Sequence, residues 1–87
     1  MYVHIGGDRM VEARSIIAIL DANILTVSPV TRQMFSHLKG QGRVEDLSPG
    51  ERKSLILTTD RLWVSPIASV TLARRARHPI PPDRDRG

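Results

Sequence analysis

Ile16-Ile17-Ala18-Ile19-Leu20 is the longest apolar run in the chain, and Asp21-Ala22-Asn23 ends it. A continuous run of apolar, largely β-branched residues of this length is typical of a β-strand that is buried on both faces. It is far too short to cross a bilayer as a helix, which takes about 20 apolar residues. We therefore expect this run to be the best candidate for the core of the fold.

Alternating segments on either side of this run predict two hairpins. Residues 2–5 and 10–14 alternate between apolar and polar side chains, and Gly6-Gly7-Asp8 separates them. Residues 53–58 and 62–65 are split by Thr59-Asp60-Arg61. A further short strand is possible over residues 43–47, and Ser48-Pro49-Gly50-Glu51 has the composition of a turn.

The central helix is predicted to begin at Ser28-Pro29 and to run to about Lys39. The serine hydroxyl can accept a hydrogen bond from the first turn, and proline is tolerated where no donor is needed. Its apolar face consists of Val30, Met34 and Leu38 together with Phe35. Gly40 stands where a helix end favours a left-handed residue.

A second, shorter helix is expected near the C-terminus. Ser69 can cap it, and it would run through Val70, Leu72 and Ala73 to about Arg77, while Pro79-Ile80-Pro81-Pro82 cannot be helical. The fold class is therefore α+β, with a small, mainly antiparallel sheet, one covering amphipathic helix and a short C-terminal helix. Residues 1–77 form one domain, and residues 78–87 are expected to be a disordered, basic, proline-rich tail.

The size and the cysteine content favour self-association. A domain of 87 residues buries only roughly 60% of the surface of its unfolded chain, so its core is thin. The chain has no cysteine, which removes disulfides as a means of stabilisation and leaves oligomerisation as the favoured one. The N-terminal residues lack the build of a signal peptide, and together with the absence of cysteine this predicts a cytoplasmic location.

Positive charge is concentrated at the C-terminal end. Residues 1–73 contain eight basic and seven acidic side chains, whereas residues 74–87 contain five arginines and two aspartates. A basic end on a balanced body is a plausible footprint for nucleic acid. The alternative is a solvated tail that binds nothing.

No constellation of residues predicts catalysis or a cofactor. His4, His37 and His78 are scattered, without the close spacing of zinc ligands, and no pair of carboxylates is selected by its spacing. Gly6-Gly7 and Gly40-Gln41-Gly42 lack the lysine and hydroxyl residue of a phosphate loop. We therefore expect a protein that is not an enzyme and takes no metal, cofactor or small-molecule substrate.

Duplex DNA is favoured over single strands. Tyr2, Phe35 and Trp63 are the only aromatic residues, too few for a platform that stacks bases. The arginine side chain suits phosphate oxygens and guanine edges. The candidate contacts are Arg52 and Lys53, and Arg74 and Arg75 with Arg77, although the last group could equally complement the dipole of the final helix.

The chain resembles the RemA/RemB family of small bacterial regulators, and is more similar to the RemB branch. The likeness covers nearly all of residues 1–77, and it rests on five segments in order: residues 1–6, residues 14–21 (Arg14, Ile16-Ile17-Ala18-Ile19 and Asp21), Ser28-Pro29, residues 53–58 (Lys53-Ser54-Leu55-Ile56-Leu57-Thr58) and residues 65–76 (Ser65-Pro66, and Ser69 to Ala76).

The resemblance implies a DNA-binding transcriptional regulator of extracellular-matrix and biofilm genes, in a family whose RemA branch forms ring-like homo-oligomers. It places the DNA contacts at Arg14, at the end of the second strand region, and at Arg52 and Lys53, in a loop that here also contains Glu51. The partners expected are double-stranded DNA and further copies of the chain, with no membrane. The alternative is a self-assembling structural or protein-interaction module that does not bind DNA.

Overall fold

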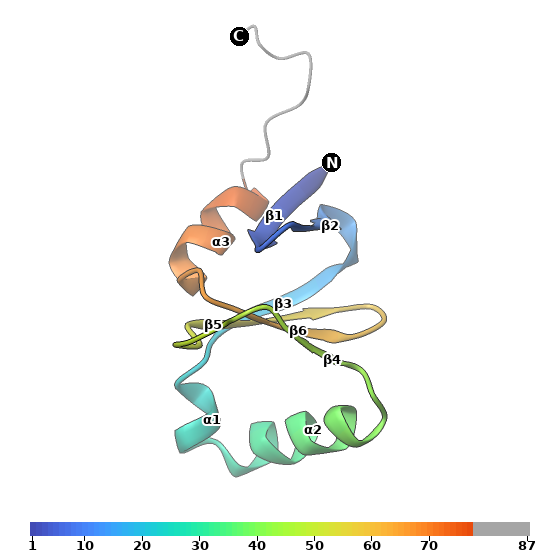
Figure 1. Cartoon of the computed structure of the whole chain (residues 1–87), viewed down its shortest axis with the longest axis vertical. Helices are drawn as coiled ribbons and strands as arrows, with labels where there is room; N and C mark the ends of the chain where they lie inside the picture. Colours follow the sequence, from blue (N-terminus) through green and yellow to red (C-terminus); the bar gives the residue numbers. More distant parts are fainter. Residues whose placement is uncertain (78–87) are drawn as a thin grey trace, which may run out of the picture.

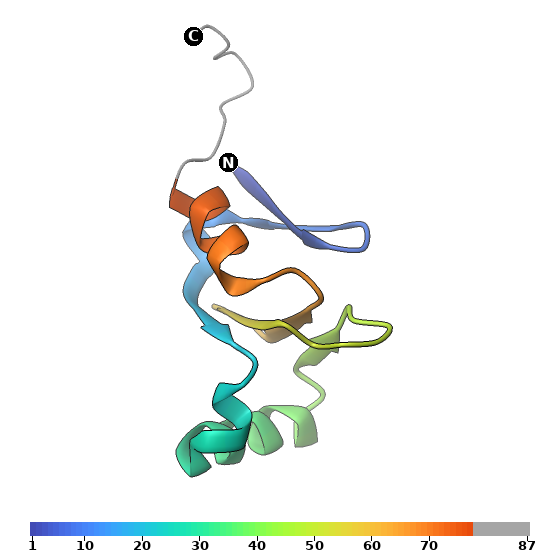
Figure 2. The ribbon, with the colours of Figure 1, turned by 90° about the vertical axis from the view of Figure 1, so that its left-hand side faces the viewer.

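The computed structural model describes residues 1–77, which form three layers (Figures 1 and 2). In chain order the elements are β1 (Tyr2–Gly6), β2 (Arg9–Glu12), the 3₁₀ turn η1 (Ala13–Ser15), β3 (Ile16–Asp21), α1 (Ile24–Val27), α2 (Pro29–Gly40), β4 (Val44–Asp46), β5 (Ser54–Thr58), β6 (Leu62–Ser65) and α3 (Ser69–Arg77). A four-stranded sheet is the middle layer; α1 and α2 cover one face, and the β1–β2 hairpin and α3 cover the other. The expected α+β class is confirmed. The predicted tail, 78–87, lies outside the described residues.

The four-stranded sheet has the order β3-β5-β6-β4. β3 pairs antiparallel with β5, and β5 with β6, whereas β4 runs parallel to β6. β1 and β2 form a separate antiparallel hairpin. The strands are therefore mainly antiparallel, as expected, and both predicted hairpins and the short strand after Arg43 are present.

The strand that is buried on both faces is β5. Its side chains alternate, so that Leu55 packs against the helical layer and Ile56 packs against the hairpin layer, and both are fully buried. On β6, Leu62 and Val64 join the helical side in the same way. Two apolar clusters thus lie on the two faces of one sheet.

The prediction that residues 16–20 form a strand buried on both faces is wrong in its burial. β3 lies at an edge of the sheet, none of its residues is fully buried, and Ile17 is 61% exposed. Ile16 and Ile19 pack against the hairpin-side cluster and Leu20 against the helical one. An edge strand has a neighbour on one side only, and an apolar run alone does not distinguish it from a central strand.

Helix α2 begins as predicted. The Thr31 amide donates to Ser28 Oγ at 3.1 Å, and Pro29 is the first helical residue. Met34, Phe35 and Leu38 pack against the helical-side cluster, which consists of Leu55, Leu62 and Val64.

Two details of α2 differ from the expectation. Val30 is 75% exposed and does not belong to the apolar face; the unpredicted helix α1 supplies Ile24 and Leu25 to the helical-side cluster instead. The left-handed residue after α2 is Gly42, with φ of 71°, and not Gly40, which is the last residue of the helix.

The hairpin and α3 are joined to the sheet by apolar packing and by serine hydroxyl groups. Val3, Ile5, Val11 and Leu72 surround Ile56. Ser65 Oγ donates to the Ile5 carbonyl oxygen at 2.6 Å, which joins β1 to β6. Ser69 is the first residue inside α3 rather than its cap, because the Ala68 carbonyl accepts the first helical hydrogen bond, from Leu72.

Candidate nucleic-acid interface

Arg52 and Lys53 are neighbours in the loop just before β5, and both are exposed. The backbone of Lys53 is fixed, because its amide donates to the Ser65 carbonyl at 2.9 Å and its carbonyl accepts from Ala22 at 3.1 Å. Both residues line an open pocket of about 530 Å³ between the start of α1, the β4–β5 loop and the start of α3. The pair is therefore held on the folded domain.

The charge of this pocket is balanced. Asp21 and Glu51 line it together with Arg52 and Lys53. One carboxylate oxygen of Asp21 accepts from the Asn23 amide at 2.9 Å, which keeps that side chain at the pocket. Two carboxylates beside two cations reduce the attraction of the site for phosphate. Glu51 does lie beside the predicted contacts, as its place in the loop indicated.

Arg74 and Arg75 lie in the last turn of α3, and both are exposed. Arg75 Nη1 donates to the His4 carbonyl oxygen at 2.9 Å, and this bond fastens the helix to strand β1. The side chain of Arg74 makes no hydrogen bond or ion pair with another residue in the described part of the chain. The two residues thus differ, since Arg75 has a structural partner.

Arg14 lies far from Arg52 and Lys53. It is exposed in η1, just before β3 begins. β3 pairs with β5 from Ile16 opposite Thr58 to Asp21 opposite Ser54. Six residues at roughly 3.3 Å each separate the two places by about 20 Å. The three residues that the resemblance selects do not form one patch on this chain.

Sequence reasoning missed the arginines that gather near Arg14. Arg43, just before β4, donates through Nε to the Asp60 carbonyl at 2.9 Å, and Arg61 begins the return into β6. Arg9, on β2, lies over the ring of Trp63. Together with Arg14, these arginines span 52 positions of the chain. Their spacing follows neither a helical nor a strand period. They come together at one end of the four-stranded sheet only because β4 pairs parallel with β6 and the β1–β2 hairpin packs on the sheet.

The chain also matches the model of a known protein family. The model described as "RemA-like: Extracellular matrix regulatory protein A-like" matches residues 2–76. The chain belongs to this family. The resemblance to the RemA/RemB family is thereby confirmed.

The chain is also similar to a named bacterial protein along most of its length. The chain is 32% identical over 77 residues to Extracellular matrix regulatory protein B of Bacillus subtilis (strain 168). The alignment covers 88% of this chain and 91% of that protein. A RemA-like chain with this relative has a regulatory role connected with the extracellular matrix.

The described residues hold no membrane-spanning helix and no metal cluster. No helix within residues 1–77 has both the length and the hydropathy needed to cross a bilayer. In the same residues, no three His, Cys, Asp or Glu side chains gather in a way that could hold a metal ion.

Proposed function

We propose that this RemA-like chain is a double-stranded-DNA-binding transcriptional regulator of extracellular-matrix and biofilm genes, and that it acts as a cytoplasmic homo-oligomer without enzymatic activity. The observation that carries the proposal is the exposure of Arg52 and Lys53 on a backbone fixed by the sheet, in a member of a family of matrix regulators. Basic side chains on a fixed backbone displace counterions from DNA phosphates at fixed positions. An assembly repeats these contacts in every copy and so multiplies their contribution to affinity.

The aromatic residues support a duplex partner over a single strand. Phe35 packs against the helical-side cluster, and Trp63 packs against the hairpin-side cluster. Tyr2, which is 63% exposed, is the one aromatic side chain with most of its ring free. Stacking of successive bases needs several exposed rings. Phosphate contacts need only the basic side chains that this chain has in abundance.

Edge strands and exposed apolar residues support self-assembly. β3 and β4 are the two edges of the sheet, and within the described residues neither has a partner strand on its outer side. Ile17 on β3 and Val70 on α3 are both more than 60% exposed. An open sheet edge is a ready template for another copy of the chain. The second candidate function, a self-assembling protein-interaction module, is favoured by the balanced charge of the pocket at Arg52 and Lys53.

Duplex affinity measured against salt tests the proposal. The perturbed proteins are the double variant Arg52→Ala/Lys53→Ala and a chain truncated after Ala76, and the control is Arg32→Ala/Lys39→Ala, which removes the same charge from α2. We expect the double variant to flatten the salt dependence by roughly 0.9 log units per lost contact per engaged subunit. The truncation should flatten the salt dependence less than the double variant does, and the control variant should flatten it least.

Three results would contradict the proposal in different ways. Failure of the wild-type protein to retain duplex DNA at low salt leaves the protein-interaction module. If truncation abolishes DNA binding while the double variant keeps the wild-type affinity and salt dependence, the C-terminal arginines make the contact and Arg52 and Lys53 do not. Sedimentation equilibrium that gives a stable 9.7 kDa monomer at micromolar concentration removes the homo-oligomer.

A further inference from the structure

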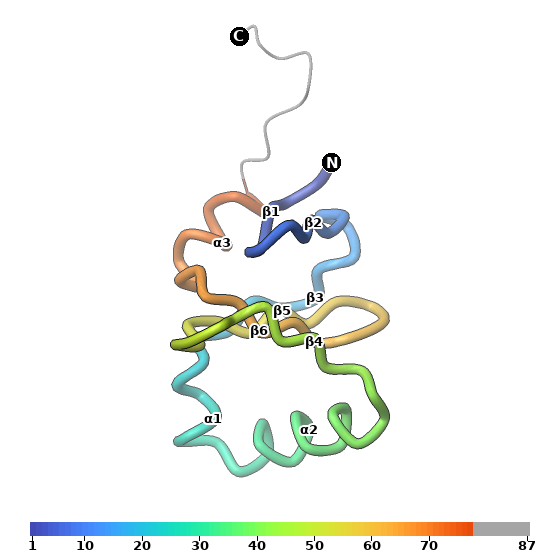
Figure 3. Tube along the Cα trace, in the orientation of Figure 1, coloured from blue at the N-terminus to red at the C-terminus, as the bar shows by residue number. Residues whose placement is uncertain are grey.

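Arginines gather at the end of the sheet that lies opposite the pocket of Arg52 and Lys53. The β5–β6 turn is at this end, and the carbonyl of Ser15, next to Arg14, accepts from the Thr59 amide at 3.0 Å. On the other side of the turn, Arg43 donates to Asp60. The tube view shows the β5–β6 turn and the β4–β5 loop on opposite sides of the molecule (Figure 3). We call Arg9, Arg14, Arg43 and Arg61 the turn-end arginines.

Trp63 holds two of the turn-end arginines in place. The guanidinium carbons of Arg9 and Arg61 lie over the indole ring, 5.9 and 5.7 Å from its centroid. The indole Nε1 donates to Thr58 Oγ1 at 3.2 Å, so the ring itself is fixed. The Thr58 hydroxyl in turn lies 2.9 Å from the Arg61 carbonyl oxygen, which ties the ring to the turn. Arg9 is thus positioned by stacking while its N–H donors stay exposed.

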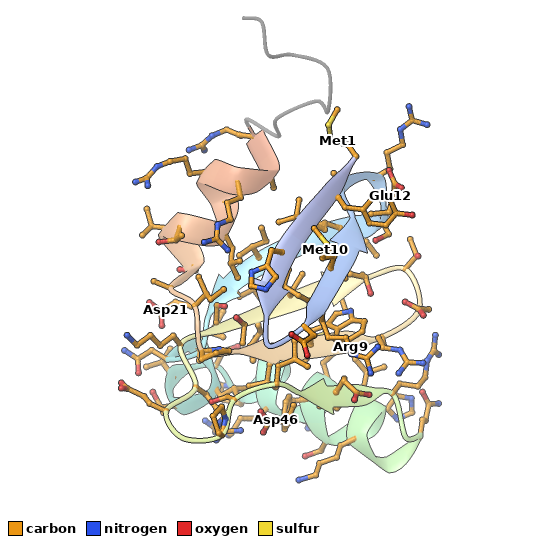
Figure 4. All side chains as sticks on the ribbon, turned by 45° about the horizontal axis from the view of Figure 1, so that its top comes forward. Met1, Arg9, Met10, Glu12, Asp21 and Asp46 are labelled. Carbon is orange, nitrogen blue, oxygen red and sulfur yellow. The ribbon has the colours of Figure 1, made fainter. Side chains whose placement is uncertain are left out.

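The turn-end arginines carry an excess of positive charge. The carboxylates that pair with them are Glu45 and Asp60, and both pair with Arg61, at 3.4 and 3.5 Å. Within the described residues, Arg9, Arg14 and Arg43 have no carboxylate partner. Figure 4 shows Arg9 and Asp21 on opposite sides of the molecule, so this carboxylate of the pocket lies away from Arg9.

We infer that the turn-end arginines are a second contact for the phosphate backbone of duplex DNA. The inference rests on the proposed function and adds a site to it. Arg14 stands at the first strand of the sheet and Arg43 at the fourth, so three strand spacings separate them by about 14 Å. This is close to the width of the major groove, about 12 Å, so the two side chains can reach phosphates on both strands.

The charge of the chain favours DNA over a second copy at this end. The net charge is +4, and three of the turn-end arginines have no carboxylate partner in the described residues. Two basic copies that met through this end would have to bury arginines against one another or find carboxylates elsewhere. A polyanion meets no such repulsion.

Trp63 is the only tryptophan of the chain, so its emission reports on this cluster alone. We would titrate the full-length protein with a mixed-sequence duplex at low salt and record tryptophan emission and the anisotropy of labelled DNA together. Binding at the turn-end arginines should change Trp63 emission with the same midpoint as the anisotropy. Arg14→Ala/Arg43→Ala, which leaves the residues over the indole in place, should reduce the salt slope by roughly one log unit per replaced arginine per engaged subunit.

Controls separate this site from the others. Arg9→Ala should lower affinity in the same way, and Arg32→Ala/Lys39→Ala on α2 should leave both the emission change and its midpoint close to wild type. Circular dichroism and the thermal midpoint of each variant verify folding. In Arg52→Ala/Lys53→Ala, DNA should still change Trp63 emission, because the turn-end site remains.

Each other outcome overturns the inference. If the duplex binds while Trp63 emission stays constant and Arg14→Ala/Arg43→Ala keeps the wild-type slope, DNA binds elsewhere and only the proposed function survives. If Trp63 emission follows protein concentration without DNA, and Arg9→Ala prevents the self-association, the turn end is a subunit interface. If no duplex is bound at all, the proposed function fails as well.

Discussion

Replacing Ser28 by alanine should destabilise the protein through the first turn of α2. Ser28 Oγ accepts from the Thr31 amide at 3.1 Å and from the Thr31 hydroxyl at 2.9 Å. Alanine removes this acceptor and leaves the amide without its partner. The site is only half-buried, so water can reach the amide in the variant.

The loss should amount to about 1 kcal/mol of unfolding free energy, the central value for a serine cap. A larger loss is not expected, because Met34, Phe35 and Leu38 anchor the rest of α2 on the sheet independently of the cap. For a domain of this size, 1 kcal/mol lowers the thermal midpoint by roughly 4–8 °C.

Urea denaturation and thermal melting at one fixed protein concentration measure the effect, since assembly makes the midpoint depend on concentration. Ser28→Asp should retain the cap and stay close to wild type. Ser36→Ala, at an exposed interior position of the same helix, should be neutral or slightly stabilising. Equal stability of Ser28→Ala and wild type, or an equal loss in Ser36→Ala, would refute the capping argument.

Two further substitutions test the hairpin layer. Leu72→Ala should cost about 2–5 kcal/mol, because the side chain is fully buried between the hairpin and the sheet, whereas Val70→Ala on the exposed face of α3 should stay within about 0.5 kcal/mol, as urea midpoints will show. Gly6→Ala should cost about 1–3 kcal/mol, since Gly6 has φ of 127° and an added Cβ would meet Pro66 Cδ at 3.0 Å; a melting curve that matches wild type would contradict it.

Much of the local structure could be predicted from the sequence, because local signals determine it. Ser28-Pro29 carries a local signal for the start of a helix, and the glycines at 6 and 7 mark a turn between two alternating segments. The burial of β3 could not be predicted in this way. The order of strands is decided by pairing between distant segments, and the run 16–20 is as apolar at an edge as it would be at the centre.

The candidate site divides in the same way. The exposure of Arg52 and Lys53 follows from the turn chemistry before β5. The turn-end arginines escaped the sequence analysis because their proximity depends on two long-range events, the parallel pairing of β4 with β6 and the packing of β2 over Trp63. Arg9 and Trp63 are 54 positions apart, so their cation–π contact produces no pattern that can be recognised in the sequence.

The two basic groups at opposite ends of the sheet suggest how the proposed self-assembly would strengthen the proposed DNA binding. Arg14 and Lys53 stand at opposite ends of the β3–β5 pair, about 20 Å apart, so one subunit presents two separated contacts rather than one patch. An assembly that keeps both ends of every copy on its DNA-facing side would repeat the two basic groups around the assembly. Each copy would then present Arg14 and Arg43 at one place and Arg52 and Lys53 at another. In such an assembly, the weak attraction of the pocket in a single copy is compatible with tight binding by the whole, because each copy adds several phosphate contacts in a fixed register.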